Sequence, residues 1–251
     1  MRKVSIFGCG WVGKPLLKLL ENEYEVLASV QSQNSFDALE GKNRYLLNES
    51  NHFFAPNFYE SDTIIIAIPP RGDYLNTIKT LCSYIKASTQ IILLSSTSVY
   101  PQTEGIVDEN ETKTVKNPSI MLETERFLQK KHQKMLILRL GGLMGYDRIA
   151  GKYTAGKTLE HDAFINYIHR DDVIAIIKMF IDTKVSEDVV NVVAPSTHSK
   201  KAVYDQNALQ FGFEKTLFNS TKIEGKTVST DKLQTFYHYD FIHPQAISFW
   251  S

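Results

Sequence analysis

Three glycines near the start of the chain limit its possible folds more than any other feature. Gly8, Gly10 and Gly13 follow a short apolar run at residues 4–7, which has the length of a buried strand. Apolar residues then recur at helical spacing, at Val12, Leu16, Leu19 and Leu20. The chain is therefore predicted to begin with a strand, a tight glycine turn and a helix, the opening unit of an α/β sheet.

Each glycine has a distinct physical role in such a turn. Gly8 permits the tight turn, Gly10 lets the backbone approach a pyrophosphate, and Gly13 lets the helix pack closely on the strand. Unpaired N–H groups and the positive end of the helix then face the phosphates. We therefore predict a dinucleotide-binding loop, against the alternative of a structural turn without a ligand. The predicted contacts are Gly8, Cys9, Gly10, Trp11, Val12 and Gly13.

Further strand-like segments alternate with helical ones along the chain. The run at residues 62–68 is apolar almost throughout, as expected for a parallel strand covered on both faces. This alternation predicts a Rossmann-type α/β fold, a doubly wound parallel sheet with right-handed crossovers. The strands predicted after the first are Glu25–Val30 and residues 45–47, 62–68, 90–94, 135–140 and 189–193.

The length of 251 residues suits one folded unit with a sizeable core, and we treat residues 1–251 as a single unit. Within it, residues 1–140 and 171–194 are predicted to form the dinucleotide-binding core. Residues 141–170 and 195–251 are less regular, and they are predicted to form a small C-terminal substrate lobe.

The carboxyl ends of the predicted strands supply the remaining cofactor contacts, because ligands of such sheets lie beyond that edge. Pro69 and Pro70 stop the run at residues 62–68 and belong to this set. The second strand ends among Ser29, Gln31 and Ser32, where a carboxylate would bind the ribose 2′-OH of NAD. A neutral polar site repels a 2′-phosphate less than a carboxylate does. We therefore predict NADP or NAD as the cofactor, with NADP(H) binding at least as well as NAD(H).

The composition narrows the class of partner. The 28 basic and 28 acidic residues cancel, so no basic field points to nucleic acid or an anionic membrane. No apolar run approaches the roughly 18 residues of a membrane span. The two cysteines, Cys9 and Cys82, are too few for a disulfide framework, so a reducing cytoplasm is the expected compartment. Nothing suggests metal-ligand spacing, and we predict no metal. The expected partner is a small-molecule substrate, and the oligomeric state stays open.

Several motifs in one order give the chain a resemblance to a known family. It resembles the short-chain dehydrogenase/reductase superfamily, in its extended, NAD-dependent epimerase/dehydratase-like branch, and looks most like an atypical subgroup of that branch. The resemblance implies a Rossmann sheet with a small C-terminal substrate lobe. It covers most of the chain and rests on G-C-G-W-V-G at 8–13, I-I-I-A-I-P-P at 64–70, L-L-S-S-T-S-V-Y at 93–100, V-D-E at 107–109, L-R-L-G-G-L-M-G at 138–145 and I-H-R-D-D-V at 168–173.

The resemblance also implies a catalytic apparatus that this chain carries only in part. Family members use a Ser or Thr, a Tyr and a Lys for proton transfer beside the hydride carrier. By position, Ser96 matches the family Ser or Thr, and Tyr100 is the candidate substitute acid. The alternative for Ser96 is a serine that merely ends a strand. The Tyr-x-x-x-Lys pair expected after Pro118 is absent, and Met121 or Leu122 stands where relatives present tyrosine.

A literal Tyr-x-x-x-Lys match occurs elsewhere, at Tyr153 and Lys157. The chain has 12 tyrosines and many lysines, so one Tyr-x-x-x-Lys match is expected by chance. It also falls where the family places substrate-lobe loops. We therefore place a displaced catalytic pair below the alternative that Lys152 or Lys157 meets an anionic substrate.

Three functions compete at this point. The first is an NAD(P)-dependent oxidoreductase or epimerase that acts on a small or sugar-like substrate. The second is an NAD(P)-binding sensor or inactive relative without turnover, which the missing Tyr-Lys pair favours. The third, a simple hydroxy-acid or 6-phosphogluconate-like dehydrogenase, shares the glycines but does not account for S-S-T-S-V-Y at 95–100.

Overall fold

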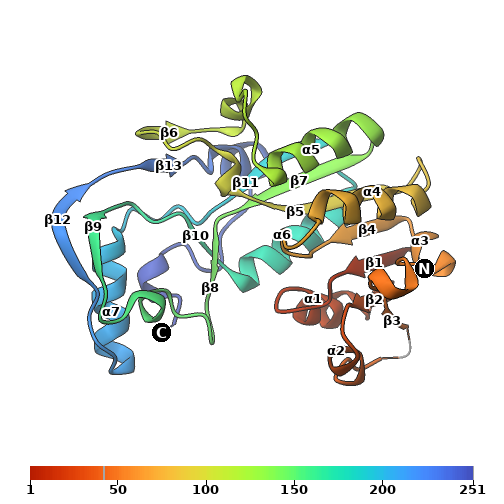
Figure 1. Ribbon diagram of the computed structural model, residues 1–251, viewed down its shortest axis with the longest axis horizontal. Coiled ribbons are helices and arrows are strands. Elements are labelled where there is room, and N and C mark those ends of the chain that lie inside the picture. Colours follow the sequence, from red (N-terminus) through yellow and green to blue (C-terminus); the bar gives the residue numbers. More distant parts are fainter. Residues whose placement is uncertain (42, 251) are drawn as a thin grey trace. The chain divides into compact units, whose positions relative to one another are not determined.

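The computed structural model describes residues 1–41 and 43–250 (Figure 1). The chain forms two compact units, each assembled from three segments. The first unit comprises Met1–Ser95, Lys116–Leu138 and Ile176–Val189. The second unit comprises Ser96–Val115, Arg139–Ala175 and Val190–Ser251. The division predicted between a dinucleotide-binding core and a substrate lobe is a functional one, and it stays a prediction.

The first unit is built on a seven-stranded sheet in the order β11-β7-β5-β4-β1-β2-β3. β1 runs parallel to both β2 and β4, and the pairings of β2 with β3 and of β4 with β5 keep the same direction. This order confirms the predicted Rossmann-type sheet. The strands are β1 (Lys3–Phe7), β2 (Glu25–Val30), β3 (Arg44–Leu46), β4 (Thr63–Ile66), β5 (Gln90–Ser96), β7 (Met135–Leu140) and β11 (Asp188–Val192).

The strand order changes direction at β1. The chain adds β2 and β3 on one side of β1, and β4, β5, β7 and β11 on the other. In open α/β sheets such a point leaves a crevice beyond the carboxyl ends of the strands, where ligands bind. The glycine turn that follows β1 lies at this point.

The apolar character of the strands follows from their burial. Ile64, Ile65 and Ile66 of β4 are at most 1% exposed, because helices cover both faces of a parallel sheet. α1 contacts β2, and α4 packs against α5. The helices of the chain are α1 (Gly13–Leu20), α2 (Gln33–Asp37), α3 (Pro56–Tyr59), α4 (Tyr74–Tyr84), α5 (Ile120–Lys131), α6 (Arg170–Thr183) and α7 (Lys200–Phe211).

The second unit contains three short parallel strand pairs instead of one large sheet. They are β6 (Gly105–Val107) with β13 (Lys226–Val228), β8 (Gly142–Met144) with β10 (Tyr167–His169), and β9 (Thr158–Asp162) with β12 (Leu217–Ile223). Short helical turns connect them, and α7 packs on one of these turns, Ala150–Thr154. Four elements begin in one unit and end in the other. They are strands β5, β7 and β11 and helix α6.

A buried carboxylate fixes the end of the chain within the second unit. Asp172, in the first turn of α6, is fully buried and accepts hydrogen bonds from the backbone N–H groups of Ile242 (2.7 Å) and His243 (3.0 Å). The Tyr239 hydroxyl donates a third bond at 2.9 Å. Three donors satisfy the carboxylate, which offsets the large cost of removing its charge from water. The aromatic C-terminal segment is therefore held in place by hydrogen bonds as well as by the packing of Phe249, which is 4% exposed.

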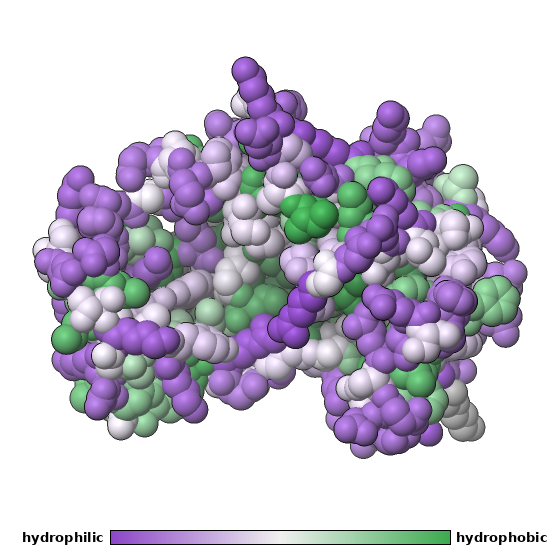
Figure 2. Space-filling view, viewed as in Figure 1, coloured by the Kyte–Doolittle hydropathy of each residue, from purple (hydrophilic) through white to green (hydrophobic). Residues whose placement is uncertain are grey.

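Among the described residues, no helix is long and apolar enough to cross a membrane. On the face that Figure 2 shows, hydrophilic residues are spread over the surface and interrupt the apolar ones. The most exposed large apolar side chains after Met1, Leu209 and Ile106, belong to different elements, α7 and β6.

Candidate functional site

The turn after β1 can be formed only with glycine at its first position. Gly8 has a φ of +99°, in the left-handed region, where a side chain is strained. A Cβ atom at this position would lie 2.7 Å from Cγ2 of Ile68 and 3.0 Å from the carbonyl carbon of Ala67. The backbone of the turn therefore lies directly against the segment that follows β4.

Gly10 and Gly13 face different surroundings. A Cβ on Gly13 would lie 3.0 Å from the Gly8 carbonyl oxygen and 3.2 Å from Cγ2 of Ile6, so the first turn of α1 packs tightly on the loop. A Cβ on Gly10 would meet no described atom within 4 Å. Gly13 is thus required by the protein's own packing, whereas Gly10 borders space that a ligand could occupy.

The N-terminus of α1 offers its positive end to that space. Val12 precedes the helix and provides no side-chain cap, and the first turn contains no acidic residue. The helix dipole adds partial positive charge at this end, where an anion is favoured. By contrast, four other helices are capped by side chains. They are α2, α4, α5 and α7, capped by Ser32, Asp73, Ser119 and Ser199.

Cys9 has a structural place in the loop. Its side chain is 1% exposed, and burial raises the pKa of its thiol to about 11, despite the opposing charge of Lys14. The thiol is therefore protonated and unreactive near neutral pH. Its backbone N–H donates to the carbonyl oxygen of Ser29 at 2.7 Å, which joins the loop to the end of β2.

The three predicted contacts at the end of β2 differ in accessibility. Ser29 is 1% exposed, and its hydroxyl faces the carbonyl oxygen of Ile6 at 3.5 Å. Gln31 and Ser32 are exposed, and the Ser32 hydroxyl accepts from the backbone N–H of Ser35 as the cap of α2. Pro69 and Pro70 follow β4 directly after the contact between Gly8 and Ile68. That these residues contact a cofactor stays a prediction.

One ionisable residue near the sheet edge was not assigned a role from the sequence. Glu125 of α5 is 1% exposed, and its Oε1 accepts a hydrogen bond from the hydroxyl of Ser95 on β5. It stands four residues after Met121, which is the spacing of Lys from Tyr in the family motif. Where Met121 replaces the tyrosine, a carboxylate therefore occupies the position of the expected lysine; where Leu122 replaces it, Arg126 does.

Tyr74 belongs to the same buried region. Its hydroxyl has no hydrogen-bond partner among the described residues. Burial, and then the charge of Glu125, raise the pKa of Tyr74 well above its usual range. Ser95, Glu125 and Tyr74 thus form a buried polar group within the first unit.

Tyr100, the candidate substitute acid, lies in a closed hydrogen-bond network of the second unit. Its side chain is 3% exposed, and its hydroxyl donates to Oδ1 of Asn191 at 2.5 Å and accepts from Arg139 at 3.1 Å. Arg139 is also buried, and it donates to the Glu109 carbonyl oxygen and the Thr112 hydroxyl. Burial raises the pKa of Tyr100 to about 12, although Arg139 acts in the opposite direction. The contacts of Tyr100 are those of a residue that satisfies a buried guanidinium.

Ser96, the other candidate, is partly exposed. Its hydroxyl accepts from the backbone N–H of Ser98 at 3.1 Å, which caps the short helical turn Thr97–Val99. The literal motif match lies elsewhere in the second unit, where Lys157 donates to the backbone oxygen of Tyr153 at 3.4 Å and the ring of Tyr153 is 60% exposed. The catalytic assignment of Ser96 and Tyr100 stays a prediction.

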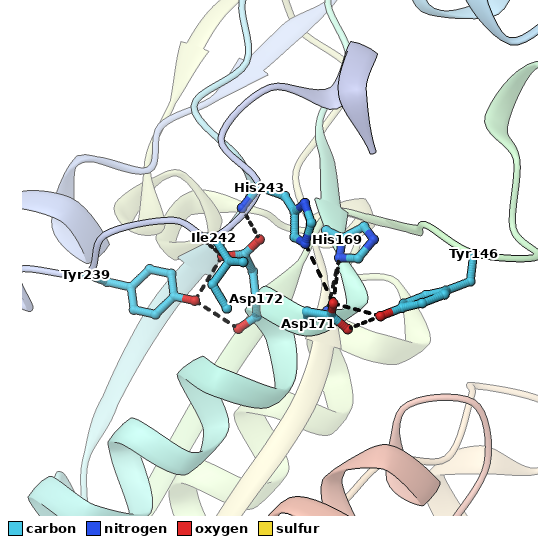
Figure 3. Close-up of polar contacts among 7 residues, drawn as sticks. All are labelled: Tyr146, His169, Asp171, Asp172, Tyr239, Ile242 and His243. Atoms are coloured by element: carbon cyan, nitrogen blue, oxygen red, sulfur yellow. Dashed lines mark hydrogen bonds and ion pairs between the residues drawn. The ribbon is translucent and has the colours of Figure 1, made fainter. Parts of the chain in front are cut away.

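A further cluster in the second unit joins residues that are distant in sequence (Figure 3). Nδ1 of His169 and Nε2 of His243 lie 3.7 Å and 3.6 Å from the same carboxylate oxygen of Asp171. The two imidazole rings are 3.8 Å apart between centroids. Burial, and then the neighbouring His243, lower the pKa of His169. Sequence reasoning missed this group because His243 comes from the C-terminal segment, far from the motif at 168–173.

Solved structures define the class of fold. The chain is similar to a candidate NAD-dependent epimerase/dehydratase from Methylobacillus flagellatus, with a TM-score of 0.78 and 21% identity over 99% of this chain and 96% of that chain. It is also similar to UDP-glucuronic acid 4-epimerase from Bacillus cereus in complex with NAD, with a TM-score of 0.72 and 16% identity over 95% and 93% of the two chains. The chain is similar as well to human epimerase family protein SDR39U1 with NADPH. The TM-score is 0.69, and the identity is 15% over 99% of this chain and 97% of that chain. The fold is therefore that of the extended short-chain dehydrogenase/reductases, which confirms the predicted resemblance at the level of fold.

A curated relative places the chain within a narrower group. The chain belongs to the family of protein YeeZ from Escherichia coli strain K12, with which it is 31% identical over 251 residues, covering 90% of each chain. No protein-family model matches it.

The network around Tyr100 generates a prediction. Tyr100→Phe should lower the free energy of unfolding by about 1–3 kcal/mol, because it leaves buried polar groups of Asn191 and Arg139 with one partner fewer. Urea denaturation measures the loss. Tyr153→Phe is the matched control, and it should change stability by less than about 0.5 kcal/mol because that ring is exposed. Unchanged stability of Tyr100→Phe, with a reduced rate of a measured reaction, would instead support a catalytic tyrosine.

Proposed function

We propose that the chain binds NADP(H) or NAD(H) across Gly8, Gly10 and Gly13 and has epimerase/dehydratase-like oxidoreductase chemistry on a small or sugar-like substrate. The observation that carries the cofactor proposal is the open space beside Gly10 at the uncapped N-terminus of α1. A pyrophosphate needs close approach of the backbone and the positive end of a helix, and this turn offers both.

Two similar structures support the choice of cofactor. The Bacillus cereus epimerase was solved with NAD, and the human epimerase family protein with NADPH. Bound to such a turn, a nicotinamide cofactor supplies hydride transfer. The chain's own residues would bind the pyrophosphate at the loop of residues 8–13 and orient the adenosine ribose with Gln31 and Ser32. Ser29, Pro69 and Pro70 would complete the contacts at the sheet edge.

The proposed chemistry does not use the family's Tyr-Lys pair. We propose Ser96 as the hydroxyl that hydrogen-bonds the substrate oxygen, with Tyr100 as the acid that the sequence offers. If Met121 takes the place of the tyrosine, Glu125 takes the place of the lysine, and a carboxylate raises a phenol's pKa because it favours the protonated phenol. The substrate oxygen would then receive its proton more slowly than in relatives that carry the pair.

This departure supports a second candidate, an NAD(P)-binding protein without turnover. A sensor would keep the glycine turn and lose the proton-transfer groups, which is the pattern of residues in this chain. The two candidates share the cofactor site and differ in whether hydride is transferred. For either, the cytoplasm is the proposed compartment, because Cys9 and Cys82 are both free thiols.

The different surroundings of Gly10 and Gly13 give a paired test of cofactor binding. Gly10→Val should weaken binding of NADP(H) and NAD(H) at least about 10-fold, because the side chain would fill the space needed by a pyrophosphate. Its melting temperature should stay close to that of the wild type, since the new side chain meets no described atom. Gly13→Val should lower stability by about 1–3 kcal/mol, because its Cβ would lie 3.0 Å from the Gly8 oxygen. Calorimetric titration and thermal denaturation measure the two effects. Absence of binding to the wild type at millimolar cofactor would contradict the proposal.

The end of β2 predicts the preference between the two cofactors. NADPH should bind at least as tightly as NADH, because Ser29, Gln31 and Ser32 present no carboxylate to the adenosine ribose. Gln31→Glu should weaken NADPH binding at least about 10-fold and leave NADH binding within a few-fold, because the new charge repels a 2′-phosphate. Fluorescence titration of the reduced cofactors measures both. A clear NADH preference of the wild type would show that the predicted preference is wrong.

The proton-transfer groups predict the rate of reaction. Turnover of nucleotide-sugars and simple alcohols should be slow or absent, because a phenol whose pKa is raised to about 12 is a weaker proton donor than an ordinary tyrosine. Cofactor absorbance during incubation with each substrate measures hydride transfer. Where turnover is seen, Ser96→Ala should reduce it about 100-fold. Rapid turnover by the wild type would contradict this prediction, and complete absence over all substrates would favour the sensor.

A further inference from the structure

Two histidines and one carboxylate come together within the second unit. His169 ends β10, Asp171 lies in the first turn of α6, and His243 belongs to the C-terminal segment. One nitrogen of each histidine and one oxygen of Asp171 lie within 4.8 Å of one another. Figure 3 shows both imidazoles directed at the Asp171 carboxylate. His169 is 4% exposed and His243 is 31% exposed, so the group is accessible from one side.

The separations are too long for direct hydrogen bonds and fit atoms that share a metal ion. Both nitrogens lie 3.6–3.7 Å from Oδ2 of Asp171, whereas N–H···O bonds measure about 2.7–3.2 Å. Two ligand atoms about 2.0–2.2 Å from a tetrahedral zinc ion are separated by about 3.3–3.6 Å. The two nitrogen–oxygen distances lie at the upper end of this second range or 0.1 Å above it, and all three ligand atoms lie within 4.8 Å of one another.

The orientation of His169 supplies the required lone pair. The backbone N–H of Asp171 donates to Nδ1 of His169 at 3.2 Å, so Nδ1 is the unprotonated nitrogen of the ring. Its other nitrogen, Nε2, lies against Gly145: a Cβ there would be only 2.3 Å away. The ring therefore presents Nδ1 to Asp171, and coordination would replace a hydrogen bond that is already long.

The carboxylate of Asp171 is held by a residue outside the cluster. The hydroxyl of Tyr146 lies 3.0 Å from Oδ1 and 2.8 Å from Oδ2 and donates to the carboxylate. The guanidinium of Arg170 lies over the ring of Tyr146 at 4.0 Å and fixes its position. Ligands in metal sites are oriented by such outer contacts, and their loss weakens metal binding about 10–100-fold.

His243 is brought to the site by the adjacent buried aspartate. Asp172 accepts the backbone N–H of His243 at 3.0 Å, and it binds Ile242 and Tyr239 as well. Phe249 packs at the edge of both imidazoles, with centroid distances of 5.3 Å and 6.3 Å. The third ligand is therefore preorganised by hydrogen bonds that do not involve its own ring.

We propose that His169, Asp171 and His243 bind a divalent transition metal ion, with zinc as the ion that suits two imidazoles and one carboxylate. Water would complete the fourth position on the exposed side. The ion would join α6 and β10 to the C-terminal segment by coordination, in addition to the hydrogen bonds of Asp172. The three proposed ligands all belong to the second unit, whereas Gly8, Gly10 and Gly13 belong to the first.

The primary experiment is titration of the full chain with Zn²⁺, after removal of metal by a chelator and of any polyhistidine tag. We expect one saturable site per chain and a melting temperature that rises with Zn²⁺ concentration, because an ion that binds only the folded state stabilises it. His243→Ala and Asp171→Asn should each weaken binding more than 10-fold and remove the thermal shift. X-ray absorption of the zinc-loaded wild type should show two imidazole nitrogens bound to the ion.

A matched control tests whether any exposed histidine gives the same result. His161 lies 3.6 Å from Glu224, which forms a histidine–carboxylate pair outside the cluster. His161→Ala should leave Zn²⁺ affinity and the thermal shift unchanged. The proposal would be overturned by absence of saturable binding, by equal binding in His243→Ala and the wild type, or by fewer than two imidazoles in the zinc-loaded wild type. X-ray absorption of the zinc-loaded wild type tests the two imidazole ligands even where a variant fails to fold.

Discussion

The contact between the glycine turn and the segment after β4 is the constraint on which the first unit depends. At Gly8 the two backbones are so close that no side chain fits between them. The same turn places α1 against β1 through Gly13. Because Gly8 and Gly13 are required for internal packing, the middle glycine of the motif, Gly10, is the one that remains open to a ligand. Two of the three glycines are therefore needed for packing, and one leaves room for a ligand.

The second unit depends on a different feature. It buries charged groups, and each of these groups has several hydrogen-bond partners. Arg139 is satisfied by Tyr100, Thr112 and a backbone carbonyl, and Asp172 by three donors from the C-terminal segment. Such groups cost much free energy when a partner is lost, so each network demands one arrangement of its segments. Short paired strands alone would specify that arrangement weakly.

The sequence predicted the regular part of the fold well, because apolar runs and glycine turns are local signals. The strand predicted at residues 45–47 is β3, Arg44–Leu46, and the strand predicted at 189–193 is β11, Asp188–Val192, each displaced by one residue. Such shifts are expected because strand ends depend on hydrogen bonds to neighbours that the pattern does not contain.

The candidate site was less predictable, because its contacts link distant segments. Tyr100 follows a recognisable motif, yet its partners Arg139 and Asn191 come from two later strands. Glu125 looks like an ordinary polar residue of a helix, and only its burial against Ser95 distinguishes it. His243 lies in a segment without regular structure, so no periodicity could connect it with His169 and Asp171.

The interleaving of the two units has a consequence for how the chain acquires its structure. β6 pairs with β13, which follows it by about 120 residues, and neither strand is longer than three residues. Such a high contact order means that most of the loop-closure entropy is lost before the pairing contributes stability. During synthesis the segment 96–115 must therefore wait for the C-terminal part of the chain, while β1–β4 already have their partners. A ribosome-bound chain that ends before β13 should therefore expose an unfinished second unit.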